Sequence, residues 1–285
     1  ACAGSLGPII PPSLTMIIYC SLTGLSIGEC FMAGVIPGLI IGLGVAVVTY
    51  FYARRLGIKG DERVPYRERL TAIKDGILAI IMPLIIIGGI VSGIFTPTES
   101  GAIAVIYALV IGMFVYKEFT YRELPRIFLK AASMTGMALL IVAGASIFSW
   151  LVAYEKFPKM IITFLTGLTD NKYVIMMLLV LFLLFVGMFI ETLSATIICA
   201  PILMPVAAQY GIDPIQFALI MVITLVYAGV TPPVGGVLFI TMGIAKAKMK
   251  EALTYLAPYL GIICIVILLL IFVPQISLLL PRLLF

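Results

Sequence analysis

Histidine is absent from this sequence of 285 residues. The chain therefore lacks the commonest general base and the commonest ligand of transition metals. No Ser-His-Asp triad can form, so the nucleophile-elbow match GLSIG at residues 24–28 predicts no hydrolase. There is also no Gly-x4-Gly-Lys-Ser/Thr phosphate loop, which excludes ATP hydrolysis by that route. We predict that the protein is not an enzyme.

Charge is scarce as well, since charged residues make up 11% of the chain and hydrophobic ones 63%. A soluble domain carries about 25% charged residues, so much of this surface is expected to face lipid. At about 20 residues per span, the length allows roughly ten spanning or half-spanning segments. The five cysteines are scattered, and no pair has metal-ligand spacing. The predicted fold class is all-α, a polytopic membrane protein.

Basic residues gather in short segments between the apolar runs. Most of the 18 lysines and arginines lie within residues 54–74, 117–130 and 246–250. This clustering follows the positive-inside rule, which places the three segments on the cytoplasmic side and argues against nucleic-acid binding. In that orientation Gly28 lies outside, Tyr52 lies inside, and the last span ends outside.

The apolar runs predict the order of segments. We expect full spans at residues 28–52, 76–95, 98–116, 136–153 and 251–273, and interfacial helices at 121–133 and 159–168. A half-span is expected at residues 13–22. To bring residues 246–250 back inside, residues 173–190 and 195–209 would form a re-entrant hairpin with its tip near 191–196. Residues 214–245 would then cross once, interrupted at 231–233.

Two interruptions of the apolar pattern resemble each other. The sequences GPIIPPS at residues 7–13 and GVTPPV at 229–234 each precede a short apolar half-helix. Each half-helix is followed by a glutamate, Glu29 or Glu251, which opens a long span containing Pro37 or Pro258. The two copies run in opposite directions. Inverted repeats with discontinuous helices are typical of secondary transporters, in which the breaks locate the binding site.

Diprolines at both breaks free main-chain oxygens within the membrane. Each Pro-Pro pair removes two N–H donors, and an unpaired backbone group in lipid costs several kcal/mol. Freed carbonyls are suited to a bound Na⁺, and half-helix N-termini are suited to a carboxylate. The alternative is a pair of proline kinks whose free groups are satisfied by neighbouring helices.

Acidic and hydroxyl side chains mark the expected hairpin tip. A carboxylate as deep as Glu191 costs at least about 2.5–3.5 kcal/mol and needs a partner or a task. It is interpreted as a cation ligand or proton carrier, or else as a structural acid at a helix N-terminus. Hydroxyl groups at Thr192, Ser194 and Thr196 add oxygen atoms, although such residues also serve helix packing.

Two further features are interpreted as structural. Thr98 is expected to cap a helix with Glu99 in its first turn. Gly34, Gly38 and Gly42 leave a bare groove on one helix face, which favours close helix packing.

Several motifs resemble the large membrane subunit of TRAP (tripartite ATP-independent periplasmic) transporters, the DctM-like family. They occur in the family's order along the chain: GSLGPIIPPS at residues 4–13, GIFTPTE at 93–99, GMFIET at 187–192, PILMP at 201–205, GIDP at 211–214, ITL at 223–225 and TPPVG at 231–235. The family's chains are usually longer, so N-terminal segments, including a first hairpin, are expected to be missing here.

The resemblance implies an elevator-type fold and Na⁺-coupled import of an organic acid across the bacterial inner membrane. The implied partners are a small four-span membrane subunit and a periplasmic substrate-binding protein. One implied Na⁺ site contains Gly7, Ile10 and Pro12; the other contains Thr192, Gly229, Thr231 and Pro233, with Glu191 beside it. The carboxylate would lie between these sites. We expect it to contact Ser13, Thr15, Ser194 and Thr231.

The implied architecture divides the chain into four parts. Residues 1–27 form the broken helix of the first repeat, and residues 136–249 form the second-repeat span, hairpin and broken helix; both belong to the transport domain. Residues 28–135 form scaffold-type spans with an interfacial helix, and residues 250–285 form the C-terminal scaffold span.

We therefore predict the permease subunit of a Na⁺-coupled importer of a C4-dicarboxylate, sialic acid or keto acid. Three alternatives remain: a stand-alone cation-coupled anion transporter of related fold, an intramembrane enzyme, and a structural subunit that does not transport.

Overall fold

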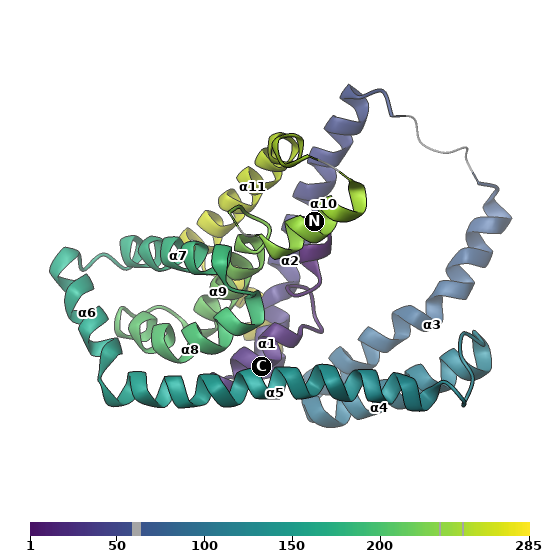
Figure 1. Ribbon diagram of the computed structural model, residues 1–285, viewed down its shortest axis with the longest axis horizontal. Helices are drawn as coiled ribbons and strands as arrows, with labels where there is room; N and C mark the ends of the chain where they lie inside the picture. The colour runs from purple at the N-terminus through teal and green to yellow at the C-terminus, as the bar shows by residue number, and fades with distance from the viewer. Residues whose placement is uncertain (59–63, 234, 247) are drawn as a thin grey trace. The chain divides into compact units, whose positions relative to one another are not determined.

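The computed structural model describes residues 1–58, 64–233, 235–246 and 248–285, and all regular structure in these ranges is helical (Figure 1). Lys59, Arg63 and Val234, which belong to motifs discussed above, lie outside the described residues. Six of the described helices are long and apolar enough to cross a membrane, or up to seven if a bent pair is counted as one span. The prediction of an all-α polytopic membrane protein is confirmed.

The helices fall into two compact units. Unit 1 contains residues 1–52 and 142–285, and unit 2 contains residues 53–141. The division into transport and scaffold parts concerns motion in a membrane and stays a prediction.

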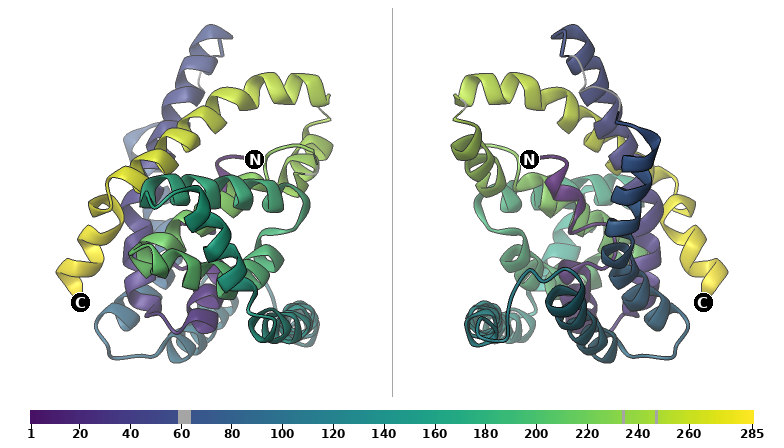
Figure 2. Two further views of the ribbon diagram at one scale, coloured as in Figure 1. Left: turned by 90° about the vertical axis from the view of Figure 1, so that its left-hand side faces the viewer. Right: turned by 90° about the vertical axis from the view of Figure 1, so that its right-hand side faces the viewer.

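Unit 1 contains both predicted helix breaks and the predicted hairpin. Its elements are η1 (Gly4–Leu6), α1 (Leu14–Thr23), most of α2 (Ile27–Arg55), the end of α5 (Leu124–Tyr154), α6 (Phe157–Leu168), α7 (Lys172–Phe189), α8 (Thr192–Gln209), α9 (Pro214–Ala228), α10 (Gly236–Ala245), α11 (Met249–Phe272) and α12 (Gln275–Leu284). Figure 2 shows α11 leading into α12 at the C-terminal end.

Helix α9 is the centre of unit 1. Every residue from Gln216 to Ala228 is buried, because α7, α8, α1, α11 and α12 all pack against this helix. A helix that is apolar on all sides needs such complete cover. At its N-terminal end, the buried Gln216 donates a hydrogen bond from Nε2 to the Leu270 carbonyl of α11 at 2.8 Å. This bond satisfies a polar group deep inside the unit and ties α9 to α11.

Helices α7 and α8 form the predicted helical hairpin. The turn between them comprises only Ile190 and Glu191. Helix α8 begins at Thr192, three residues before the predicted start, because the Glu191 side chain caps it. Gly187 lets α7 approach α9 closely, since a Cβ at this position would lie 2.6 Å from the Ala228 Cβ. The hairpin therefore rests on the end of α9 that leads into the second break.

The bare glycine face of α2 is approached most closely by the loop of the first break. A Cβ added at Gly34 would lie 2.6 Å from the Ile9 carbonyl oxygen, and one at Gly38 would lie 2.6 Å from Ile10 Cγ1. Leu219 of α9 also borders Gly34. The expectation of a close approach was right, but the partner is the main chain of the first break, held between α2 and α9.

Unit 2 contains α3 (Tyr66–Val91), α4 (Pro97–Val110), a π-helical turn (Ile111–Val115) and the first part of α5. Helices α3 and α4 form an antiparallel pair in which the Tyr107 hydroxyl donates to the Leu78 carbonyl at 2.8 Å. Thr96 caps α4 in a capping box with Glu99. The predicted cap Thr98 is wrong because Pro97 takes the first helical position, which leaves the residue before it as the N-cap.

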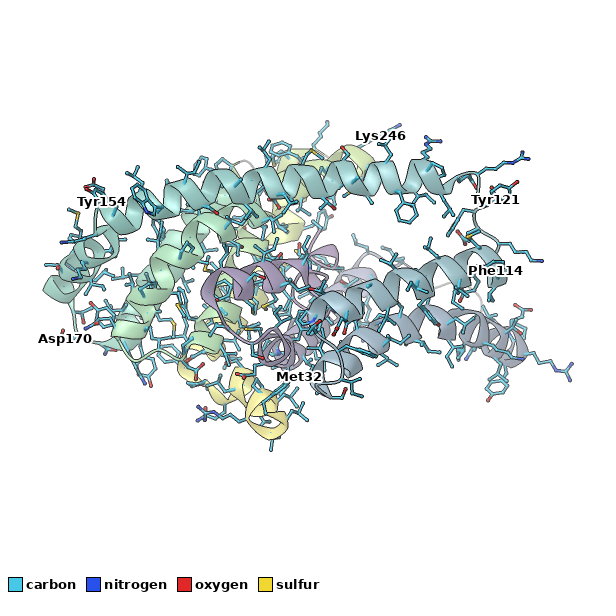
Figure 3. The ribbon with its side chains drawn as sticks, turned by 90° about the horizontal axis from the view of Figure 1, so that it is seen from below. Met32, Phe114, Tyr121, Tyr154, Asp170 and Lys246 are labelled. Atoms are coloured by element: carbon cyan, nitrogen blue, oxygen red, sulfur yellow. The ribbon has the colours of Figure 1, made fainter. Side chains whose placement is uncertain are left out.

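Three predicted boundaries also differ. Residues 121–133 and 136–153 were expected as separate segments, but α5 is one helix from Leu124 to Tyr154, drawn between the labels Tyr121 and Tyr154 in Figure 3. No proline follows Pro125 in that range, so nothing interrupts the hydrogen-bond ladder. Helix α3 starts ten residues before residue 76. Helix α12 was not predicted, since Ser277, Pro281 and Arg282 interrupt its ten residues and leave no long apolar run.

Replacing Gly34 with Ala is expected to destabilise the protein, because the new methyl group would collide with the Ile9 carbonyl oxygen. Overpacking of this kind costs about 1–3 kcal/mol. Gly42→Ala is the matched control, since its nearest neighbour, Leu6 Cδ1, would lie at an ordinary 3.6 Å. Thermal unfolding of the purified protein in detergent should shift to lower temperature for Gly34→Ala only. Equal shifts for both variants would contradict the close approach of loop and helix.

Candidate functional site

The hairpin tip and the second helix break enclose a cavity of about 470 Å³. Glu191 and Thr192 line it from the tip, and Gly229 lines it from the break. The remaining lining residues come from the end of α7 and the first turns of α10: Gly187, Met188, Phe189, Ile190, Gly236, Val237 and Ile240. Three residues of the predicted second cation site thus share one cavity.

Glu191 is held by the helix that it caps. Its Oε2 accepts hydrogen bonds from the Leu193 N–H at 2.9 Å and the Ser194 N–H at 3.1 Å. A carboxylate is favoured at this place by the helix dipole and by the unpaired N–H groups of the first turn. The geometry matches the structural alternative stated for this residue. It also orients a negative charge at the cavity wall.

Thr192 brings side-chain and main-chain oxygens together. Its Oγ1 donates to the Leu225 carbonyl of α9 at 3.4 Å. A Cβ built at Gly229 would lie 3.6 Å from the same Oγ1, so this hydroxyl also borders the break. Hydroxyl and main-chain oxygens at an unwound helix are ligands that Na⁺ uses in transporters.

The second break runs from Gly229 to Gly235. The Gly229 carbonyl accepts from the Val237 N–H of α10 at 3.2 Å, so the two half-helices are joined directly across the break. Gly235 has φ 41°, a conformation that glycine adopts without steric cost. A side chain there would also approach the Thr231 carbonyl oxygen to 3.0 Å. The break is therefore compact, and its main chain folds back on itself.

Thr231 and Pro233 lie in this break but are not among the residues given above for the cavity wall. The Thr231 hydroxyl donates to the Tyr227 carbonyl one turn earlier at 2.9 Å. Pro233 is exposed, and its bond to Pro232 is cis. The structure places both residues next to the cavity-lining Gly229. Their role as cation ligands stays a prediction.

The first break is a tight loop between η1 and α1. Gly7 closes η1 through its N–H to the Gly4 carbonyl at 3.3 Å, and the Ile10 N–H donates to the Leu6 carbonyl at 2.9 Å. The bond between Pro11 and Pro12 is cis, and Pro12 is half-buried. Gly7, Ile10 and Pro12 thus share one loop, as the predicted first site requires.

One predicted substrate contact, Ser13, has a structural task in the described chain. Ser13 is the N-cap of α1: its hydroxyl accepts from the Met16 N–H at 3.2 Å and donates to the Pro8 carbonyl. Thr15, in the first turn of α1, is buried. Ser194 is half-buried beside the hairpin tip. A common contact of Ser13, Thr15, Ser194 and Thr231 with one substrate stays a prediction.

The N-terminal residues of the chain share a second cavity with α10. A cavity of about 300 Å³ is lined by Ala1, Cys2 and Ala3, just before η1, and by Leu238 in the first turn of α10. Chain segments more than 200 residues apart therefore meet at this cavity, and the proximity of the two breaks stays a prediction.

Among the described residues, no group of three or more His, Cys, Asp or Glu side chains is arranged to hold a metal ion. A cation at the 470 Å³ cavity would meet hydroxyl and main-chain oxygens together with the single carboxylate of Glu191. The Leu225 carbonyl was missed by the sequence interpretation, because any residue type supplies a carbonyl and only the fold shows which one faces Thr192.

A family profile described as "Tripartite ATP-independent periplasmic transporter, DctM component" matches residues 1–276. The chain belongs to this family. The DctM relatives include a putative TRAP transporter large permease protein of Haemophilus influenzae, 34% identical over 97% of this chain. The C4-dicarboxylate TRAP transporter large permease protein DctM of Pseudomonas aeruginosa is 36% identical over 98% of the chain. The sialic acid permease SiaM of Vibrio cholerae is also 36% identical over 98%.

The chain spans 65% or 66% of the length of these three DctM relatives. Their names describe transporter permeases, and the substrates named differ between them. Membership therefore places the chain in the DctM family of TRAP transporters and leaves the substrate open.

Glu191→Ala is expected to lower the free energy of unfolding by about 0.5–2 kcal/mol, since it removes an N-cap acceptor. Glu191→Gln should cost less, because an amide oxygen can still accept from the N–H groups of Leu193 and Ser194. Thermal unfolding in detergent compares the two variants. A loss as large for Gln as for Ala would show that the charge, and not the acceptor, stabilises α8.

Proposed function

We propose that this chain is the permease part of a Na⁺-coupled importer of a small organic acid in the bacterial inner membrane. A periplasmic binding protein would deliver the acid, and a small membrane subunit would complete the complex. The observation that carries the proposal is the cavity shared by the hairpin tip and the second helix break, with Glu191, Thr192 and Gly229 in its wall. Family membership and the organic acids named for two relatives support it.

The charge of the cavity suggests why transport would need a cation. Glu191 is the one charged side chain among the lining residues of this cavity. A substrate carboxylate about 5 Å away would be repelled by about 3 kcal/mol at an effective dielectric constant of about 20. A Na⁺ held by Thr192 and the neighbouring carbonyls would offset that repulsion. Substrate would then bind well only after the cation, which is the requirement for coupled transport.

Glu191 has a second effect on binding. It already occupies the anion-favouring N-terminus of α8. The N-terminus of α10, at Gly236, faces the same cavity and is not capped by a side chain. The substrate carboxylate is therefore assigned to the α10 side, and the cation to the side of Thr192.

The decisive experiment reconstitutes the full-length permease with its small subunit and binding protein in liposomes. Radiolabelled uptake of candidate organic acids is expected only when an inward Na⁺ gradient is imposed. A K⁺ gradient of equal size is the control. Uptake of the same rate in both conditions would refute Na⁺ coupling.

A stand-alone anion transporter is the second candidate. Omitting the binding protein from the same experiment distinguishes this alternative from the importer that depends on a binding protein. We expect uptake to stop without it, and undiminished uptake would favour the stand-alone alternative.

Thr192→Val is expected to weaken the apparent affinity for Na⁺ roughly tenfold or more. Valine has about the size of threonine but lacks the hydroxyl group that is proposed to bind the cation. Hydrogen bonds and contacts to charged groups contribute about 1.5–3 kcal/mol. Thr254→Val is the matched control, since that hydroxyl bonds only within the exposed turn of α11, to Lys250. The Na⁺ dependence of uptake measures both variants. An unchanged Na⁺ dependence in Thr192→Val would remove this residue from the cation site.

A further inference from the structure

Helices α7 and α11 enclose an apolar groove that shares no residue with the candidate site. Its volume is about 210 Å³. On α7 the lining residues are spaced i, i+3, i+4 and i+7: Met177, Val180, Leu181 and Leu184. Residues with this spacing lie along one face of a helix. The same spacing recurs on α11 from Cys264 to Ile271, so each helix contributes one stripe about two turns long.

The groove is covered on one side only. Val180, Ile267 and Ile271 are buried, whereas Leu181 and Leu268 are 62% and 42% exposed. Both helices are long and apolar enough to cross a membrane. An exposed apolar rim on two such spans is expected to face acyl chains and not water.

A basic and aromatic cluster marks one end of the groove. Tyr173 lies four residues before Met177 and stacks on Phe272 of α11, with ring centroids 5.4 Å apart. Phe272 in turn lies four residues after Leu268, so the two rings continue the two stripes. The exposed Lys172 holds its Nζ over the Tyr173 ring, 5.1 Å from the centroid. Tyrosine and lysine at the end of a span are typical of the membrane–water interface.

The stacked rings also fix the relative direction of the two helices. Tyr173 belongs to the first turn of α7 and Phe272 is the last residue of α11, so the start of one helix lies beside the end of the other. The predicted orientation places the end of α11 on the outer side of the membrane. Lys172 is therefore expected at the level of the outer headgroups.

We propose that this groove binds one acyl chain of an anionic phospholipid of the outer leaflet, with its phosphate at Lys172. The two apolar stripes match an acyl chain, and the ammonium group at their end matches a negative headgroup. A helix is too large an occupant, because one turn about 10 Å across and about 5.4 Å high has about twice the volume of the groove. A single narrow chain fits.

The position is tested with the full-length permease in complex with its small subunit, in nanodiscs of phosphatidylcholine. These contain a small fraction of phosphatidylglycerol with a diazirine in its acyl chain. Irradiation should attach this lipid to residues 177–184 and 264–271, located by peptide mass spectrometry. Labelling absent there in the complex but present in the permease alone would assign the groove to the small subunit and overturn the proposal.

Filling the groove should displace the lipid. Cys264→Phe places a ring among the lining residues and is expected to reduce the labelling severalfold. Ile265→Phe is the matched control, since Ile265 is 58% exposed on the same helix but does not line the groove. Labelling that stays unchanged in Cys264→Phe, or falls equally in both variants, would contradict a lipid seated between α7 and α11.

The headgroup assignment is tested by native mass spectrometry of the delipidated complex titrated with phosphatidylglycerol or phosphatidylcholine. Lys172→Gln should weaken the binding of phosphatidylglycerol about fivefold and leave that of phosphatidylcholine unchanged. Lys159→Gln is the control, because Lys159 of α6 is also an exposed lysine of unit 1 but lies outside the groove. Equal affinity of the unaltered complex for the two lipids, or an equal loss in both variants, would refute the assignment. These measurements record lipid binding directly, so their outcome does not depend on the proposed function.

Discussion

The main-chain polar groups at the two helix breaks set the requirements for the rest of unit 1. Backbone N–H and C=O groups that leave a helix inside apolar surroundings need partners. At the first break Ser13 bonds to Pro8 and Met16, and Gly34 lets α2 approach the Ile9 carbonyl. At the second break Thr231 bonds back to α9, and the Val237 N–H reaches the Gly229 carbonyl. The positions of the hydroxyls, glycines and helix ends near the breaks therefore follow largely from one constraint, which is that the freed main-chain groups need hydrogen-bond partners.

The hydrogen bonds at the second break also show which oxygen atoms beside the cavity are already engaged. The Leu225 carbonyl accepts from the Thr192 hydroxyl at 3.4 Å and from the Gly229 N–H at 3.1 Å, so both of its lone pairs have partners. Glu191 contributes the negative charge, and its position is set by α8. The site thus depends on the packing of α7, α8 and α9, and less on the chemistry of any single side chain.

The strongest features of the fold could be predicted from the sequence because proline acts locally. Pro11, Pro12, Pro232 and Pro233 remove backbone donors wherever they occur, so both breaks were expected where the structure has them. The hairpin turn at Glu191 was also expected. The continuity of α5 was not, because the basic residues in its first half indicated a separate surface helix. Whether a segment with a polar face joins the following apolar segment in one helix depends on what surrounds it and not on local helix propensity.

The individual roles of site residues were harder to predict. The capping role of Ser13 at the start of α1 was not predicted, and its contact with substrate stays a prediction. Gly34 was expected to admit a helix, but it admits a loop. Both outcomes depend on which segments distant in sequence lie opposite the residue. Pattern alone does not contain that information.

The side-chain amide of Gln216 limits how far α9 can move relative to α11 within unit 1. Helix α9 is fixed to the last turn of α11 at one end by this buried bond and borders the ion cavity at the other. Any displacement of the cavity along the membrane normal must either break the bond, which leaves the Leu270 carbonyl without this partner, or carry the end of α11 along. The C-terminal span is thus coupled to the candidate site through α9, by this hydrogen bond and by the packing of α11 and α12 on the same helix.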